Sequence, residues 1–338
     1  MSQFQKLLIW DTSRRVVIRQ VGLGGQWYGD QEEYTEKKLS LKSLLYQVNI
    51  LCTSLQIEVL TMNLGEPKPF HDILSRPVYG NTASDGSLLQ AQKWISCCIS
   101  NHENCASGLP SRLPKRVVDL KLRNPRLYET HNELAQYVCL SHCWGTSRPS
   151  CATTSLSLKA NQKCIEWESM PRTFQDAIHF TRRLGIRYIW IDSMCIIQDD
   201  ERDWREQSAV MASIYQNAYL TLCATHSSSD DNGCYSQLPP DSVVQKGTMV
   251  KKDGVEYDVY FRIYPKNGRR KDHLPDSNCA TSTYHLHEFP LMARAWTYQE
   301  RLPSPRLLHF TSSEVHGMRG GMRVHTLHKV IGMKCNEV

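Results

Sequence analysis

Hydrophobic and polar positions alternate between a strand period and a helix period in the middle of the chain. The run at 137–145 (Tyr-Val-Cys-Leu-Ser-His-Cys-Trp-Gly) is apolar at first, becomes polar at Ser141 and reaches a turn residue at Gly145, as a buried strand with a polar end does. β-rich runs follow at 187–191 and 219–224, each after a segment of helical period. This alternation predicts an α/β domain with a parallel sheet and right-handed crossovers.

Both predicted helices carry sequence signals near their ends. Thr173 and Asp176 have the spacing of a capping box, and Gly185 is expected to end the helix that follows them. The second helix is expected to begin at Asp203, whose side chain would cap it, and to bury Trp204. The apolar faces of these helices are therefore predicted to cover the sheet.

The pattern is looser on both sides of this domain. Strands are predicted at 6–10 and 15–21, and a helix is predicted at 88–99. The chain is expected to divide into four regions: 1–112 (a smaller α+β region), 113–235 (the α/β domain), 236–314 (an incomplete C-terminal extension) and 315–338 (an atypical basic tail).

Composition and charge argue against a nucleic-acid-binding protein and a secreted or membrane protein, but do not indicate a particular function. The net charge of +6 arises from 40 basic and 34 acidic residues that are spread along the 338 residues without a long basic block, so no nucleic-acid partner is predicted. The apolar run near the N-terminus is short and an aspartate follows it, so we expect no signal peptide, no membrane span and a cytoplasmic protein. The thirteen cysteines are then expected to be thiols.

Polar residues follow the predicted strands at one edge of the sheet. In a parallel sheet, ligands bind beyond the carboxyl ends of the strands. The candidate ligand-binding residues at this edge are Ser141, His142, Trp144, Gly145 and Ser193.

A nucleophilic site is one hypothesis for this edge. Cys195 could act with His142 as its base and Asp192 as the acid that orients the base. However, Cys195 lies in the apolar run 194–197, where a buried core thiol is the more ordinary explanation.

A second group of possible metal ligands precedes the domain. Cys98, His102 and Cys105 could supply three ligands to zinc, but a structural zinc site needs four and no second Cys-x-x-Cys pair is present. The favoured interpretation is therefore a helix end that packs its cysteines as small hydrophobic residues, with no metal bound.

Five runs of residues carry a resemblance to a known family. They are Leu-Ser-His-Cys-Trp-Gly at 140–145, Pro-Arg-Thr-Phe-Gln-Asp-Ala-Ile at 171–178, Tyr-Ile-Trp-Ile-Asp-Ser-Met-Cys-Ile-Ile-Gln at 188–198, Ile-Tyr-Gln-Asn-Ala at 214–218, and Ala-Trp-Thr-Tyr-Gln-Glu-Arg at 295–301 with Ser-Pro-Arg-Leu-Leu at 304–308. In this order they resemble the fungal heterokaryon incompatibility (HET) domain and the segment that follows it. The resemblance implies a role in self/non-self recognition and regulated cell death, with protein partners or self-association. The chain departs from the family pattern after about residue 314.

The resemblance also implies a possible enzyme, because the HET domain has been likened to the TIR fold, some members of which cleave NAD with a glutamate. On that analogy NAD would be the substrate and the catalytic acid would be Asp192, Glu206 or Glu300, with Trp144 and Trp204 as aromatic walls. The alternative is a non-catalytic signalling or oligomerisation module, or an inactive shortened relative. In that case the same residues would be structural, and Asp192 would cap the turn that follows its strand.

Overall fold

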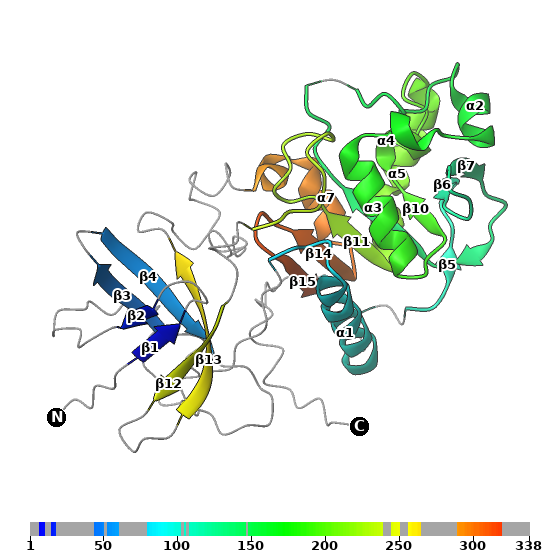
Figure 1. Cartoon of the computed structure of the whole chain (residues 1–338). Coiled ribbons are helices and arrows are strands. Elements are labelled where there is room, and N and C mark those ends of the chain that lie inside the picture. The colour runs from blue at the N-terminus through cyan, green and yellow to red at the C-terminus, as the bar shows by residue number, and fades with distance from the viewer. Residues whose placement is uncertain are drawn as a thin grey trace. The chain divides into compact units, whose positions relative to one another are not determined.

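The computed structural model describes residues 7–10, 15–17, 44–50, 53–60, 80–102, 105, 108–146, 148–238, 245–250, 256–264 and 289–319. The chain divides into two compact units, one made of 1–80 with 238–270 and the other of 81–237 with 271–338 (Figure 1). None of the described helices combines the length and the apolar character that crossing a membrane requires.

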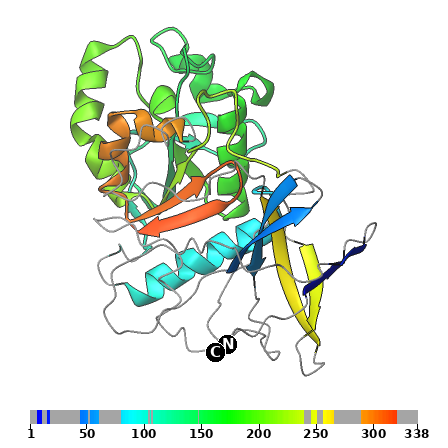
Figure 2. The same ribbon diagram turned by 90° about the vertical axis from the view of Figure 1, so that its left-hand side faces the viewer.

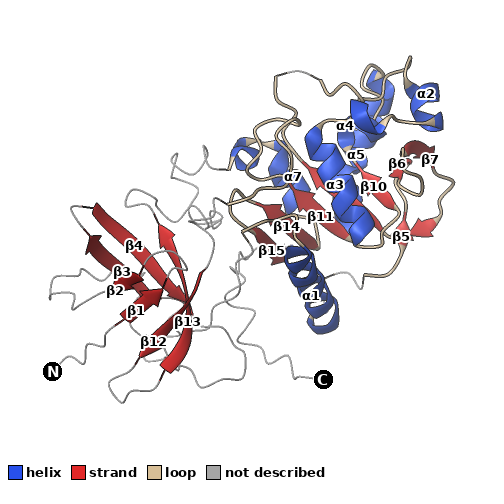
Figure 3. Cartoon of the chain, in the orientation of Figure 1, coloured by secondary structure: helices blue, strands red, loops and turns tan. Residues whose placement is uncertain are grey.

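The first unit contains a six-stranded antiparallel sheet (Figure 3). In spatial order its strands are β2 (Arg15–Val17), β1 (Leu7–Trp10), β12 (Gln245–Val250), β13 (Glu256–Tyr264), β4 (Thr53–Leu60) and β3 (Leu44–Ile50). The predicted strands at 6–10 and 15–21 do pair with each other as β1 and β2. β12 and β13 lie in the region 236–314, which is expected to be a C-terminal extension, and they pair with strands of the first sixty residues.

The second unit is built on a seven-stranded mixed sheet. In spatial order its strands are β15 (Val315–Arg319), β14 (Arg306–Phe310), β11 (Leu220–Cys223), β9 (Tyr137–Ser141), β10 (Tyr188–Trp190), β6 (Arg116–Asp119) and β7 (Arg126–Glu129). The inner four, from β14 to β10, are parallel to one another, and an antiparallel strand or hairpin closes each edge. The predicted α/β class and parallel core are therefore confirmed in a mixed sheet. One strand, β15, lies within the region expected to be an atypical tail.

The order of the parallel strands places the helices on both faces of the sheet. Chain order β9, β10, β11, β14 becomes spatial order 2-1-3-4, which is the order of doubly wound, flavodoxin-like sheets. The crossover through α3 (Arg172–Arg183) connects β9 to β10 on one side of it. The crossover through α5 (Glu201–Asn217) connects β10 to β11 on the other side of β9. Crossovers of one hand that run in opposite directions put their helices on opposite faces, as Figure 2 shows for α3 and α5.

Two predicted helix caps are wrong. The N-cap of α3 is Pro171, so Thr173 and Asp176 lie inside the helix, where Asp176 accepts hydrogen bonds from the backbone of the 234–235 segment. The N-cap of α5 is Asp200, whose carboxylate accepts hydrogen bonds from the backbone N–H groups of Arg202 and Asp203. In both cases the predicted capping residue is used for a tertiary contact instead.

Short elements and one long helix complete this unit. The long helix, α1 (Asp85–Asn101), is capped by Ser84 and packs against β14 and β15, so it belongs to this unit and not to the N-terminal region that the sequence suggested. The remaining elements are β5 (Ser111–Arg112), β8 (Leu134–Ala135), α2 (Leu158–Lys163), η1 (Trp167–Ser169), α4 (Asp192–Cys195), η3 (Pro290–Ala293) and α7 (Trp296–Arg301).

A buried ion pair joins β6 to α5. Arg116 and Asp203 are 2% and 3% exposed and are hydrogen-bonded to each other. Arg116 Nε also donates to the carbonyl of Cys195 at 2.8 Å, while Asp203 accepts from the N–H of Ile197 at 2.9 Å and from Lys115 Nζ at 2.9 Å. Both charged groups therefore have hydrogen-bond partners besides each other, which helps a buried pair to be tolerated.

The ionised form of Asp203 is the one that the fold favours. Burial alone would raise the pKa of this carboxyl, but hydrogen bonds from Arg116, from the Ile197 N–H and from Lys115 lower the pKa to about 2. Because folding lowers the pKa, the contribution to stability is complete above the ordinary value of 3.8 and is lost as the pH falls towards about 2.

We expect Asp203→Asn to lower the free energy of unfolding by roughly 3–5 kcal/mol at pH 7, because it removes the buried counter-ion of Arg116 and leaves only the half-exposed Glu129 at 3.9 Å. Urea denaturation followed by tryptophan fluorescence measures this value. The deficit relative to wild type should shrink as the pH falls from about 4 to about 2. Glu206→Gln, which changes an exposed acid on the same helix, serves as the control and should have little effect; equal losses in the two variants would contradict the role of the buried pair.

Candidate functional site

The polar cluster lies at the switch point of the parallel sheet. Strand β9 is the first of the parallel strands in the chain. The crossover from β9 leads to β10 on one side of it, and the crossover from β10 leads to β11 on its other side. A crevice for ligands is therefore expected between the carboxyl ends of β9 and β11. Ser141 ends β9 and is in register with Cys223, the last residue of β11. Residues of β9, of the β10 end and of α7 meet at this point.

Glu300 is the buried acid of the cluster. It comes from α7, is 3% exposed, and its carboxyl accepts a hydrogen bond from the Ser141 hydroxyl, although the two residues are 159 positions apart. Ser304 holds the end of α7 in place, because its hydroxyl donates to the backbone carbonyl of Glu300 at 2.7 Å and forms a hydrogen bond of 2.8 Å with the hydroxyl of Thr221 in β11. The position of Glu300 is thus set by contacts with two neighbouring strands.

The surroundings of Glu300 keep its carboxyl close to half-ionised at neutral pH. Burial raises the pKa of Glu300 to about 7, and the negative charge of Asp192 acts in the same direction. The hydrogen bond from Ser141 and the positive charge of Arg294 act in the opposite direction but are outweighed. A carboxyl group with such a pKa can give or take a proton at physiological pH.

Asp192 is the second acid and is more open to solvent. Its side chain is 20% exposed. The indole N–H of Trp144 lies 3.2 Å from one carboxylate oxygen, and the backbone N–H of Ser193 donates to the other at 2.7 Å. Gly145 makes the turn behind Trp144 with a positive φ of 83°, and a Cβ added there would lie 2.9 Å from Ser229 Cβ. A glycine is therefore needed to bring Trp144 back to Asp192.

His142 lies beneath Asp192 and is neutral. The ring is fully buried against Phe174, with ring centroids 4.9 Å apart, and Nδ1 lies 4.0 Å from the nearer Asp192 oxygen. Burial lowers the pKa of His142 to about 4, with Asp192 opposing this effect and Arg294 adding to it. Its backbone carbonyl accepts a hydrogen bond from Arg294, whose positive charge also acts on Glu300.

Two buried polar atoms at this edge remain without a hydrogen-bond partner among the described residues. They are Nε2 of His142 and Oγ of Ser193. Buried polar groups are usually hydrogen-bonded, and exceptions are found at sites that receive water or a ligand. These two residues are among the ligand-binding candidates that the sequence suggested.

Other sequence candidates are not brought to the cluster. Glu206 lies on an exposed part of α5, where it pairs with Lys115 at 3.1 Å and Arg202 at 3.0 Å. Trp204 is 47% exposed, so the prediction that it faces the core is wrong. Cys195 is buried, and burial raises the pKa of its thiol to about 12, which does not suit a nucleophile.

The sequence interpretation missed Arg294. It immediately precedes the run at 295–301 that contributes Glu300, so a charged residue next to that motif was the available signal. No local pattern indicates that its guanidinium turns toward His142, because that contact depends on the docking of α7 against the sheet.

We expect Glu300→Gln to change the pH dependence of stability. Folding raises the pKa of Glu300 from 4.5 to about 7, so wild type loses stability as the pH rises through this interval, by about 3 kcal/mol at most. Glutamine can still accept the Ser141 hydrogen bond and does not ionise. The unfolding free energy of the variant minus that of wild type should therefore increase between pH 5 and pH 8 in urea titrations; a pH-independent difference would contradict the raised pKa.

Comparison with known proteins identifies the family. Residues 137–300 match the family model of the heterokaryon incompatibility protein (HET), from the first residue of β9 to Glu300 itself. No curated protein and no solved structure matches the chain. The matched range contains β9, β10 and β11, the switch point and both acids described above, so the chain is a protein with a heterokaryon incompatibility (HET) domain.

Proposed function

We propose that this HET domain acts in regulated cell death after self/non-self recognition, and that it does so by hydrolysing the bond between nicotinamide and ribose in NAD or a related nucleotide. The observation that carries the proposal is the buried carboxyl of Glu300, with its pKa near 7, beside Asp192 at the switch point. Enzymes that cleave glycosidic bonds commonly use two carboxyl groups whose different surroundings give them different roles.

The proposed reaction assigns a separate role to each acid. The carbon–nitrogen bond breaks first, and its electron pair leaves with nicotinamide, which becomes neutral. The positive charge that develops on the ribose is stabilised by the carboxylate of Asp192. Ionised Glu300 takes a proton from a water molecule whose oxygen bonds to the ribose carbon, and this proton is later released to solvent. The products are nicotinamide, ADP-ribose and a proton.

Neighbouring groups suit the binding of a nucleotide. Trp144 and Arg294 are both partly exposed, in contrast to Glu300 and Ser141, so they are accessible to an incoming molecule. An indole ring offers a stacking face, and a guanidinium can pair with a phosphate. Self-association or a protein partner would bring the domain under the control of recognition, as the family resemblance implies.

We expect the purified full chain to release nicotinamide from NAD, measured by chromatography. Glu300→Gln should reduce the rate by at least about 10²-fold, because a general base contributes on that scale. Asp192→Asn should also reduce it, whereas Glu206→Gln should retain wild-type activity because this acid lies away from the cluster. Far-ultraviolet circular dichroism checks that each variant is folded. Equal turnover in wild type and folded Glu300→Gln would exclude this role for Glu300.

The rate should also depend on pH in a defined direction. Because the proposed base is ionised Glu300, kcat/KM should rise with pH and level off above about 7. Initial rates from pH 5 to pH 9 at fixed ionic strength measure this profile. A rate that falls over this interval would indicate that Glu300 acts as a proton donor instead.

A non-catalytic signalling module is the second candidate. Both acids already have hydrogen-bond partners, Glu300 from Ser141 and Asp192 from Trp144 and Ser193, as structural residues would. Expression of wild type and Glu300→Gln in fungal cells separates the two functions. Death caused by wild type alone supports the enzyme, whereas equal death from both proteins, with no loss of NAD, supports the module.

A further inference from the structure

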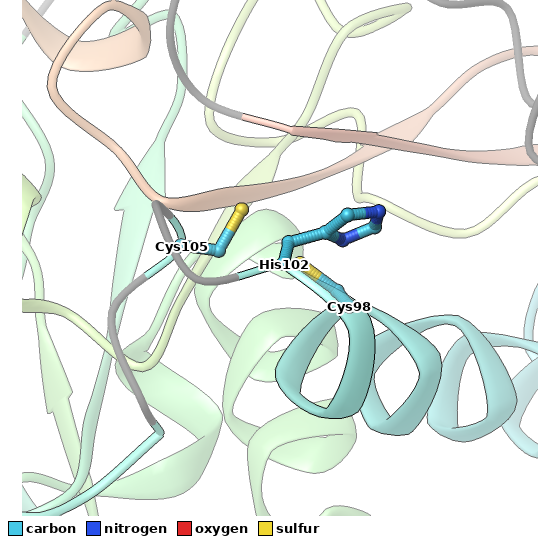
Figure 4. Close-up of side chains that lie close together, drawn as sticks. All are labelled: Cys98, His102 and Cys105. Carbon is cyan, nitrogen blue, oxygen red and sulfur yellow. The ribbon is translucent and has the colours of Figure 1, made fainter.

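Three potential metal ligands meet where α1 ends. Cys98 is in the last turn of α1, His102 is its C-cap, and Cys105 follows three residues later. The ligand atoms of these three residues all lie within 4.8 Å of one another, and Figure 4 shows the three side chains grouped at the helix end. Among the described residues, these three form the one group of at least three histidine, cysteine or acidic side chains whose ligand atoms lie close enough together to hold a metal ion.

The backbone holds these residues in place. A spacing of four positions puts Cys98 and His102 on one face of the helix, and the His102 N–H donates to the Cys98 carbonyl at 3.2 Å. The Cys105 N–H donates to the His102 carbonyl at 3.1 Å, and this hydrogen bond keeps the second thiol close to the first. Ligand atoms of a tetrahedral zinc site lie about 3.5–4 Å apart, so small side-chain rotations would bring the three into coordinating positions.

Both cysteines of the group are shielded from solvent. Cys98 and Cys105 are each 7% exposed, in contrast to the exposed Cys164. The side chain of Arg306, on β14, is hydrogen-bonded to Cys98. A bound cation lowers the pKa of its thiol ligands far more strongly than a neighbouring guanidinium does, and a hydrogen bond to a ligand sulphur helps to orient it.

We propose that Cys98, His102 and Cys105 bind a thiophilic divalent cation of the zinc type. Each cysteine loses its proton to solvent as its sulphur binds the metal, and the fourth coordination position is left to a water molecule or to a further side chain. Because α1 packs on β14 and β15 and Arg306 belongs to β14, the ion lies at the end of this helix, beside the edge of the HET-domain sheet. This site is separate from the Glu300 cluster and does not depend on its proposed chemistry.

Metal titration of the full chain tests this proposal. Protein treated with a chelator and a reductant should bind one equivalent of Co²⁺ with the visible bands of a tetrahedral site and a thiolate-to-cobalt charge-transfer band, and Zn²⁺ should displace the Co²⁺. The double variant Cys98→Ser/Cys105→Ser should lose this spectrum. Cys164→Ser, the matched control, and Glu300→Gln should keep it. The absence of the charge-transfer band in wild type, or its retention in the double variant, would overturn the assignment.

Thiol protection provides a test that needs no variant. With Zn²⁺ at about 100 times its dissociation constant, alkylation of Cys98 and Cys105 should slow by about 100-fold, whereas alkylation of Cys164 should not change. Peptide mapping by mass spectrometry reads each cysteine separately. Equal alkylation with and without Zn²⁺, or a Cys98–Cys105 disulfide that forms in air and excludes the metal, would refute a metal site and indicate a redox pair.

Discussion

The hydrogen bond from Ser141 to Glu300 joins the first parallel strand to a helix 159 residues further along the chain. In the same structure β9 and β11 are paired, and Ser304, which follows α7, is hydrogen-bonded to Thr221 of β11. The same placement removes Glu300 from water and thereby raises its pKa. The chemistry of the cluster is therefore a consequence of how α7 docks on the sheet.

Buried charge is handled in two different ways in this domain. Asp203 is surrounded by donors and a guanidinium, so burial leaves it ionised and it acts as a structural link between β6 and α5. Glu300 has one hydroxyl donor and a neighbouring acid, so burial leaves its pKa near neutrality. The number of donors around each carboxyl separates a structural acid from one suited to proton transfer.

The family match and the fold support different parts of the functional argument. The match to the HET family covers 137–300 and includes the strand ends at which the acids gather. The order of the parallel strands independently places a ligand crevice at the same ends. The metal site that we propose lies before the matched range, on a helix that packs on the edge strands β14 and β15, so it would stabilise the domain from outside the family motif.

Local periodicity and turn residues were enough to predict α1, α3 and α5, the parallel strands β9, β10 and β11, and the polar ends of β9 and β10, because these depend on neighbours within a few positions. They also marked Ser141, His142 and Asp192 as candidates. The sequence did not show which of Glu300 and Glu206 belongs to the polar cluster. It also did not predict that β12 and β13 pair with N-terminal strands, or that Asp200 rather than Asp203 caps α5. Those outcomes were decided by the tertiary structure, because each depends on contacts between segments far apart in the chain, whose energies local patterns do not contain.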